Sequence, residues 1–294
     1  MHHQGWVMLS NKVREIMSKE LTTAPASSTV EEVMEKLVAE SVDAVLLTEN
    51  SIPAGIFTER HVLKYVAGAP SDKRTAPVAG IMTSPIRAVS EETPIVEALG
   101  EMFQRRIRHL LVWAEEQQKV VGVISMRRIL RMVVEIGHGV NETRTVGEIM
   151  APDPLSVDQA TMVADVIELM NRRDSGAVVV NSAADPVGIF TEHDVLRRVV
   201  LPDKDPRRLR ISEVMTAPVI TAPKSALVGN VLDEMHRRNI RNMPVRDDDG
   251  KLAGLLSMPE ILQYARALDI DDAVRHAWKE IQEFYDSLDI YTPG

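Results

Sequence analysis

The residues best suited to chemistry in this chain are a threonine and an aspartate three positions apart, Thr191 and Asp194, which follow Gly188. A carboxylate can accept hydrogen bonds from two neighbouring sugar hydroxyls, and an adjacent hydroxyl can donate or accept another. The same Thr-x-x-Asp spacing also fits the start of a helix, where it would form a capping box. The two interpretations are compatible, and the sequence leaves both open.

Catalytic and metal chemistry has no comparable motif. The chain has no cysteines, and its eight histidines include no HExxH pair, so we expect no metal site. It contains no P-loop and no nucleophile elbow, which argues against an enzyme and a catalytic cofactor. A formal net charge of -9 argues against nucleic-acid and membrane-surface binding. Because no signal peptide or membrane-spanning run is recognisable, we expect a cytoplasmic protein.

The elements that must position Thr191 and Asp194 belong to a unit that occurs four times. Four segments of the same form end in methionine, at Met17, Met82, Met150 and Met215, so the repeat is about 65 residues long. Each is followed at a constant distance by apolar residues with the i, i+3, i+4, i+7 spacing of an amphipathic helix. These sets are Val30, Val33, Met34 and Leu37; Ile95, Ala98, Leu99 and Met102; Val163, Val166, Ile167 and Met170; and Val228, Val231, Leu232 and Met235.

Each unit continues with two apolar runs separated by a polar turn, and then a second helix. In the third unit the runs are Ala177–Val180 and Val187–Phe190, and the helix is Glu192–Val200. In the fourth unit the closing helix is Pro259–Leu268. The order per unit is therefore strand, helix, strand, strand, helix, which predicts an α+β fold.

The four units form two pairs. The segment Gly55–Leu63 reappears at Gly188–Leu196, and Ile107–Val112 reappears at Ile240–Val245, each shifted by the same distance. We therefore predict an N-terminal extension at 1–12, a first pair at 13–138 (units 13–70 and 78–138), a second pair at 146–268 (units 146–205 and 211–268) and a tail at 269–294. Aromatic residues at helical spacing in the tail favour a helix that packs on its own module or across a dimer, over a helix that docks a partner.

In these four repeats the chain resembles the CBS-domain family, named for cystathionine beta-synthase, over nearly its whole length. The resemblance implies four tandem β-α-β-β-α repeats paired into two pseudo-twofold Bateman modules, with a C-terminal helix added. It also implies regulatory binding of AMP, ADP or ATP, and sometimes S-adenosylmethionine, in clefts between paired units. The ligand motif of the family is a glycine, two apolar residues, Thr or Ser, two variable residues and Asp.

Only the third unit matches that motif fully, with Gly188, Thr191 and Asp194. The first unit has Thr58 but places His61 at the acidic position. The second has Ser125 and Arg128, and the fourth has Ser257 and Glu260. The resemblance therefore favours the second pair as the ligand-binding module.

The cleft residues follow from the positions of the partner units. Around Thr191 and Asp194 we predict Ile189, Ile220, Ile240, Arg241, Asn242 and Met243, with Arg241 as a phosphate ligand. The mirrored site would combine Ser257 and Glu260 with Leu155, Ser175, Gly176 and Ala177. In the first pair the corresponding residues are Thr58, Arg108 and His109.

The leading hypothesis is a sensor with AMP, ADP or ATP as its regulatory ligand. Occupancy would alter a regulated protein, which the sequence does not identify, or the chain's own oligomeric state, for which we expect a homodimer. One alternative is a ligand-independent scaffold or dimerisation protein, favoured by the altered motifs in three units. The others are a sensor of S-adenosylmethionine and an enzyme of a kind that no motif supports.

Overall fold

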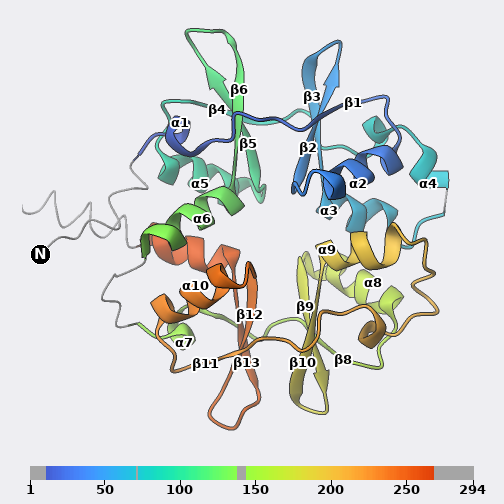
Figure 1. The fold of residues 1–294 in the computed structure, drawn as a ribbon, viewed down its shortest axis with the longest axis vertical. Coiled ribbons are helices and arrows are strands. Elements are labelled where there is room, and N and C mark those ends of the chain that lie inside the picture. The colour runs from blue at the N-terminus through green and yellow to red at the C-terminus, as the bar shows by residue number, and fades with distance from the viewer. Residues whose placement is uncertain (1–10, 71, 138–143, 268–294) are drawn as a thin grey trace, which may run out of the picture.

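The computed structural model describes residues 11–70, 72–137 and 144–267. Its four units lie around a common centre, with the first pair in one half and the second pair in the other (Figure 1). The predicted tail and nearly all of the N-terminal extension lie outside the described residues. Within the described ranges, no helix combines the length and the apolar character needed to cross a membrane.

All four units contain the predicted order of elements. The first has α1 (Val13–Ile16), β1 (Thr23–Pro25), α2 (Val30–Ala39), β2 (Ala44–Glu49), β3 (Ile52–Thr58), α3 (Glu59–His61) and η2 (Val62–Val66), followed by α4 (Asp72–Thr75). The second has η3 (Val78–Gly80), β4 (Ala88–Ser90), α5 (Ile95–Arg105), β5 (His109–Ala114), β6 (Lys119–Ser125) and α6 (Met126–Gly137).

The second pair repeats this order. The third unit has α7 (Val146–Ile149), β7 (Ala151–Pro152), β8 (Ser156–Asp158), α8 (Val163–Arg173), β9 (Ala177–Ser182), β10 (Asp185–Thr191), α9 (Glu192–Asp194) and η4 (Val195–Val200). The fourth has η5 (Ile211–Glu213), β11 (Ala222–Pro223), α10 (Val228–Arg237), β12 (Asn242–Arg246), β13 (Leu252–Ser257) and a closing helix at 258–267. The α+β prediction is confirmed.

Each unit has a small sheet in which the first strand is parallel to the second and the second forms a hairpin with the third. In the third unit the order is β8-β9-β10, with Thr191 opposite Ala177 at the end of the hairpin. In all four units the apolar stripe predicted for the first helix is buried. The sheet and this helix together fix where the hairpin ends and where the closing helix begins.

The repeated methionines join the two units of each pair. Met215, which opens the fourth unit, packs on Gly188 of the third, and Met150, which opens the third, packs on Gly254 of the fourth. Met17 and Met82 make the same exchange with Gly122 and Gly55. A Cβ atom at Gly122 would lie 2.6 Å from the carbonyl oxygen of Ser18, so only glycine fits there. The exchange holds the two faces of each cleft together.

The hydrophobic cores run between the pairs. Apart from the opening segments, which the paired units exchange, one core combines buried residues of the first and third units, and the other combines those of the second and fourth. Contacts of α3 with α9, of η2 with η4 and of α6 with α10 carry this packing. The segments Thr58–His61 and Thr191–Asp194 consequently approach each other near the centre of the molecule (Figure 1).

Candidate ligand-binding site

The cleft of the second pair holds a cavity of about 300 Å³, which we call the second-pair cavity. Arg108, which is predicted for the first pair, lines it. So do ten of the residues predicted for the second pair: Ser175, Gly176, Ala177, Ile189, Thr191, Asp194, Ile240, Arg241, Asn242 and Ser257. These ten come from both the third and the fourth units. Residues of both sites that the sequence predicts for this pair therefore face one continuous space.

Thr191 and Asp194 lie where β10 turns into α9. The Oδ2 atom of Asp194 accepts hydrogen bonds from the backbone nitrogen of Thr191 at 2.9 Å and from its hydroxyl at 2.8 Å. The Oδ1 atom accepts one from the Thr216 hydroxyl at 3.2 Å and lies 3.3 Å from Arg198 Nε. The capping interpretation is thus confirmed, and it coexists with the cavity, because both side chains also line that space.

Four predicted residues line neither the second-pair cavity nor the cavity in the cleft of the first pair. Met243 is buried in the core of the second and fourth units, and Ile220 packs against the same core. Leu155 packs against the core of the first and third units. Glu260 accepts hydrogen bonds from the backbone nitrogen of Ser257, at 3.1 Å, and from its hydroxyl, so it caps the closing helix.

Arg241 is a positively charged side chain of the fourth unit. It lines the second-pair cavity and also a cavity in the first pair. Its guanidinium group has no hydrogen bond or ion pair with any residue that the structure describes. An unpaired guanidinium group offers a planar, bidentate donor for a phosphate oxygen.

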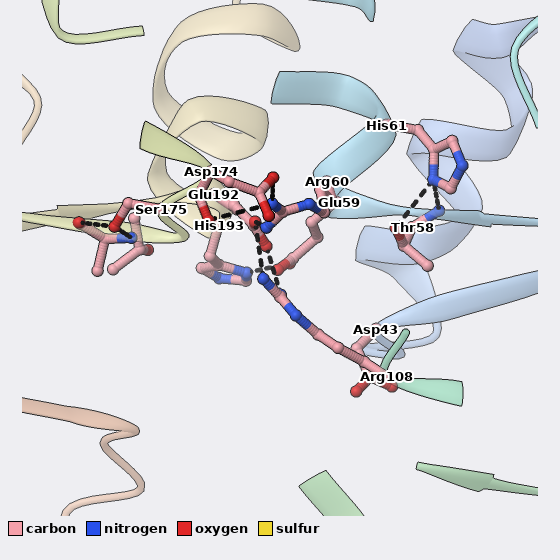
Figure 2. Close-up of polar contacts among 12 residues, drawn as sticks. Asp43, Thr58, Glu59, Arg60, His61, Arg108, Asp174, Ser175, Glu192 and His193 are labelled. Atoms are coloured by element: carbon pink, nitrogen blue, oxygen red, sulfur yellow. Dashed lines mark hydrogen bonds and ion pairs between the residues drawn. The ribbon is translucent and has the colours of Figure 1, made fainter. Parts of the chain in front are cut away.

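The cleft of the first pair holds a cavity of about 310 Å³, the first-pair cavity, and the predicted residues Thr58, Arg108 and His109 line it. Here His61 occupies the acidic position of the motif. Its Nδ1 atom accepts a hydrogen bond from the backbone nitrogen of Thr58 at 3.0 Å (Figure 2). Its Nε2 atom lies 2.9 Å from the Thr83 hydroxyl. Burial, aided by the charge of Lys64, lowers the pKa of His61 to about 4, so this ring is neutral at pH 7.

A cluster of charges, the central ion cluster, joins the two pairs. It consists of Glu59, Arg60, Arg108, Asp174, Glu192 and His193 (Figure 2). The buried Glu192 carboxylate accepts two hydrogen bonds from Arg108, at 2.7 and 3.1 Å, and one from Arg60 at 3.1 Å. Arg60 also pairs with Asp174, and His193 Nδ1 lies 2.6 Å from Glu59 Oε1.

The electrostatics of Glu192 follow from these contacts. Burial alone would raise its pKa, but the guanidinium groups of Arg108 and Arg60 outweigh burial and hold the pKa below its usual range. Arg108 shows the reciprocal effect, because Glu192 outweighs burial and raises the pKa of Arg108. Both groups are therefore charged at pH 7.

Sequence reasoning missed Glu59, Arg60, Glu192 and His193, which occupy the two variable positions of the motif. One signal was present: the Thr-Glu step at Thr58–Glu59 recurs at Thr191–Glu192. That step shows where the two motifs are alike, but only the packing of the first unit against the third shows that they meet.

Comparison with known proteins identifies the class to which this fold and cleft belong. The CBS-domain family matches residues 13–68, 78–135, 146–201 and 211–267, which together make up most of the chain. The chain belongs to the CBS-domain family, with four copies of the domain.

Individual relatives match most of this chain in sequence. CBS domain-containing protein CBSCBSPB1 of Arabidopsis thaliana is 27% identical over 297 residues, an alignment that covers 87% of this chain and 54% of the relative. The chain spans about half the length of the curated relatives it matches.

Two crystal structures show the same fold. That of protein MJ1225 from Methanocaldococcus jannaschii matches with a TM-score of 0.74 at 18% identity and covers 86% of this chain and 99% of its own. That of a conserved Pyrococcus horikoshii protein matches with a TM-score of 0.59 at 20% identity, with the same coverage. At these identities the likeness concerns the fold.

Proposed function

We propose that this chain is a regulatory, non-catalytic protein that binds an adenosine nucleotide, AMP, ADP or ATP, in the second-pair cavity. One observation carries the proposal: Thr191 and Asp194 line the same space as Arg241, which is unpaired among the described residues. The Asp194 carboxylate is placed to accept hydrogen bonds from ribose hydroxyls, in exchange for its bond from the Thr216 hydroxyl. Arg241 supplies the positive charge for a phosphate group.

The remaining walls suit a purine base. Ile189 and Ile240 line the cavity together with Gly176 and Ala177. Apolar walls with a few fixed polar groups are typical of small-molecule sites, and the size of the cavity lies at the lower end of their range. A nucleoside monophosphate therefore suits this site best among the adenosine ligands.

The central ion cluster connects ligand binding in the second-pair cavity to the first pair. Glu192 follows Thr191 directly in the chain, and its carboxylate is bound by Arg108 and Arg60 of the first pair. A ligand that draws Thr191 or Asp194 into the cavity also displaces Glu192, which alters the contact between the pairs. We propose that this change reaches a regulated protein in the cytoplasm, or the self-association of the chain as a homodimer.

Isothermal titration calorimetry with AMP, ADP and ATP tests the site. Asp194→Ala should weaken binding of the preferred nucleotide by about tenfold to a hundredfold, because it removes charge-assisted hydrogen bonds. The matched control is Asp165→Ala, an aspartate on α8 that does not line the cavity. Undiminished binding by Asp194→Ala with an unchanged melting temperature would overturn the assignment.

A ligand-independent scaffold is the second candidate, because one observation favours it. The Asp194 carboxylate has protein partners for both of its oxygens, and the two pairs share two hydrophobic cores. This candidate predicts that the protein binds none of the three nucleotides and that Asp194→Ala changes stability alone. S-adenosylmethionine fits less well, because its sulfonium cation would lie near the Arg241 guanidinium group.

A further inference from the structure

Six arginines line the first-pair cavity, together with four carboxylates. The arginines are Arg60, Arg87, Arg106, Arg108, Arg127 and Arg241, and the carboxylates are Asp43, Glu59, Asp174 and Glu192. His61, at the position that carries the aspartate of the motif in the second pair, is neutral at pH 7. The cavity therefore has an excess of positive charge and lacks a carboxylate where the second pair presents one.

Three of the four carboxylates are paired with a neighbouring basic side chain, and the fourth, Asp43, lies near His109 without a hydrogen bond to it. Glu192 is bound by Arg60 and Arg108, and Asp174 by Arg60. Glu59 lies against His193, and Asp43 Oδ2 lies 3.5 Å from His109 Nε2. Burial would raise the pKa of Asp43, but His109 and the nearby Arg127 outweigh it and lower the pKa, so this group is ionised as well.

Three of the arginines have side chains without a partner among the described residues: Arg87, Arg106 and Arg241. Arg87 directly precedes β4, Arg106 directly follows α5, and Arg241 directly precedes β12 of the second pair. Three separate elements thus place uncompensated guanidinium groups around one space. Since guanidinium groups repel one another unless an anion lies between them, this arrangement suits a ligand with several negative charges.

His109 adds an independent sign of a ligand. Its side chain is only 9% exposed and lines the cavity, yet its Nε2 atom forms no hydrogen bond with the part of the chain that the structure describes, and its contact with Asp43 is longer than a good hydrogen bond. A buried polar atom without a hydrogen bond is costly unless a ligand or water completes it. A phosphate oxygen in this cavity would accept that bond.

We propose that the first-pair cavity is a second binding site, specific for an oligophosphate chain such as pyrophosphate or tripolyphosphate, free or as part of a nucleotide. Arg87 and Arg106 bind the chain from the first pair, and Arg241 completes the site from the second pair. His61 is hydrogen-bonded to Thr58 and Thr83, and because a histidine stands where the third unit has Asp194, this position presents no carboxylate that would repel the phosphates. This inference does not depend on nucleotide binding in the second-pair cavity.

Calorimetric titration of the full chain with sodium tripolyphosphate tests the proposal. Arg106→Gln and Arg241→Gln should each weaken binding by about tenfold or more, because each removes a charged donor to phosphate. The matched control is Arg105→Gln, the preceding residue on α5, which pairs with Glu101 and does not line the cavity. No binding, or equal binding by all four proteins, would overturn the proposal.

Two further arms separate this site from its alternatives. Asp194→Ala, which tests the nucleotide site, should leave tripolyphosphate binding unchanged, so the two proposals can fail separately. ATP should compete with tripolyphosphate in the Asp194→Ala protein, whereas AMP should bind there about tenfold or more weakly than either, because it offers one phosphate to three guanidinium groups. If AMP binds as tightly as tripolyphosphate, and if Arg106→Gln weakens AMP binding, the cavity recognises a single phosphate and the oligophosphate assignment is wrong.

Discussion

Replacing Glu192 by glutamine should destabilise the protein more than any other single change to the ionic contacts described above. The side chain of Glu192 is 6% exposed, whereas those of Arg60 and Arg108 are 29% and 37% exposed. Glutamine keeps the size and one acceptor oxygen, but it leaves Arg108 without its ion-pair partner and leaves Arg60 with Asp174 alone. Breaking a fully buried ion pair costs about 3 to 5 kcal/mol, and the partial exposure of both arginines reduces this to roughly 2 to 3 kcal/mol.

Chemical denaturation of wild type and Glu192→Gln at pH 7 measures this loss. The pKa of Glu192 is lowered in the folded state, so its contribution is present above the pKa of the unfolded chain and is lost as the pH falls through the folded value. The difference between the two proteins should therefore shrink below pH 4.5, the ordinary pKa of a glutamate. As a control, Glu234→Gln removes a carboxylate that pairs with Arg237 and Arg238 at the surface, and it should leave stability unchanged. A loss below about 0.5 kcal/mol for Glu192→Gln, the size of a surface pair, would show that the ion cluster does not hold the pairs together.

Two other substitutions test the packing and the first-pair cavity. Gly122→Ala should destabilise the protein by about 1 to 3 kcal/mol, because the added Cβ would meet the Ser18 carbonyl oxygen. The control is Gly229→Ala on α10, where nothing lies within 4 Å of the added Cβ, and it should stabilise the protein by up to about 1 kcal/mol. Equal changes of melting temperature in the two variants would contradict the methionine exchange. The pKa of His61 falls from 6.5 to about 4 on folding, so protonation of this residue favours the unfolded chain. As the pH falls from 7 to 4, His61 alone should therefore lower the free energy of unfolding of the wild type by roughly 2 to 3 kcal/mol. His61→Gln should lack that part of the pH dependence in denaturant titrations.

Local features of the fold were predictable because they depend on spacing within one unit. The four buried helical stripes match the predicted sets residue by residue, since a period of 3.6 leaves one face for the core. The cap at Thr191 was predictable because a threonine and an aspartate three positions apart form a capping box within one segment. Only some of the predicted cleft residues line the cavity. Asn242 does, whereas Met243 is in the core, because adjacent side chains of a strand point to opposite faces.

Features between units were not predictable from these patterns. Each repeated methionine and each repeated glycine is visible in the sequence, but their reciprocal contact depends on how two units exchange their opening segments. Contacts between the two pairs were not predictable either, as Arg108 shows. Its position predicts a ligand contact of the first pair, yet its guanidinium group binds Glu192 of the third unit, because the packing of the two pairs brings this end of the second unit beside the third.

The position of Arg108 also determines how the two cavities affect each other. An anion in the first-pair cavity competes with Glu192 for Arg108, and Glu192 is attached to Thr191 of the second-pair cavity. Arg241 lines both spaces, so a phosphate bound in one removes positive charge from the other. Since coupling between two sites is reciprocal, each ligand must change the affinity for the other by the same factor. Shared use of Arg241 predicts that this factor is unfavourable, and the Arg241→Gln protein, which lacks the shared charge, should show weaker coupling than the wild type when the two ligands are titrated together.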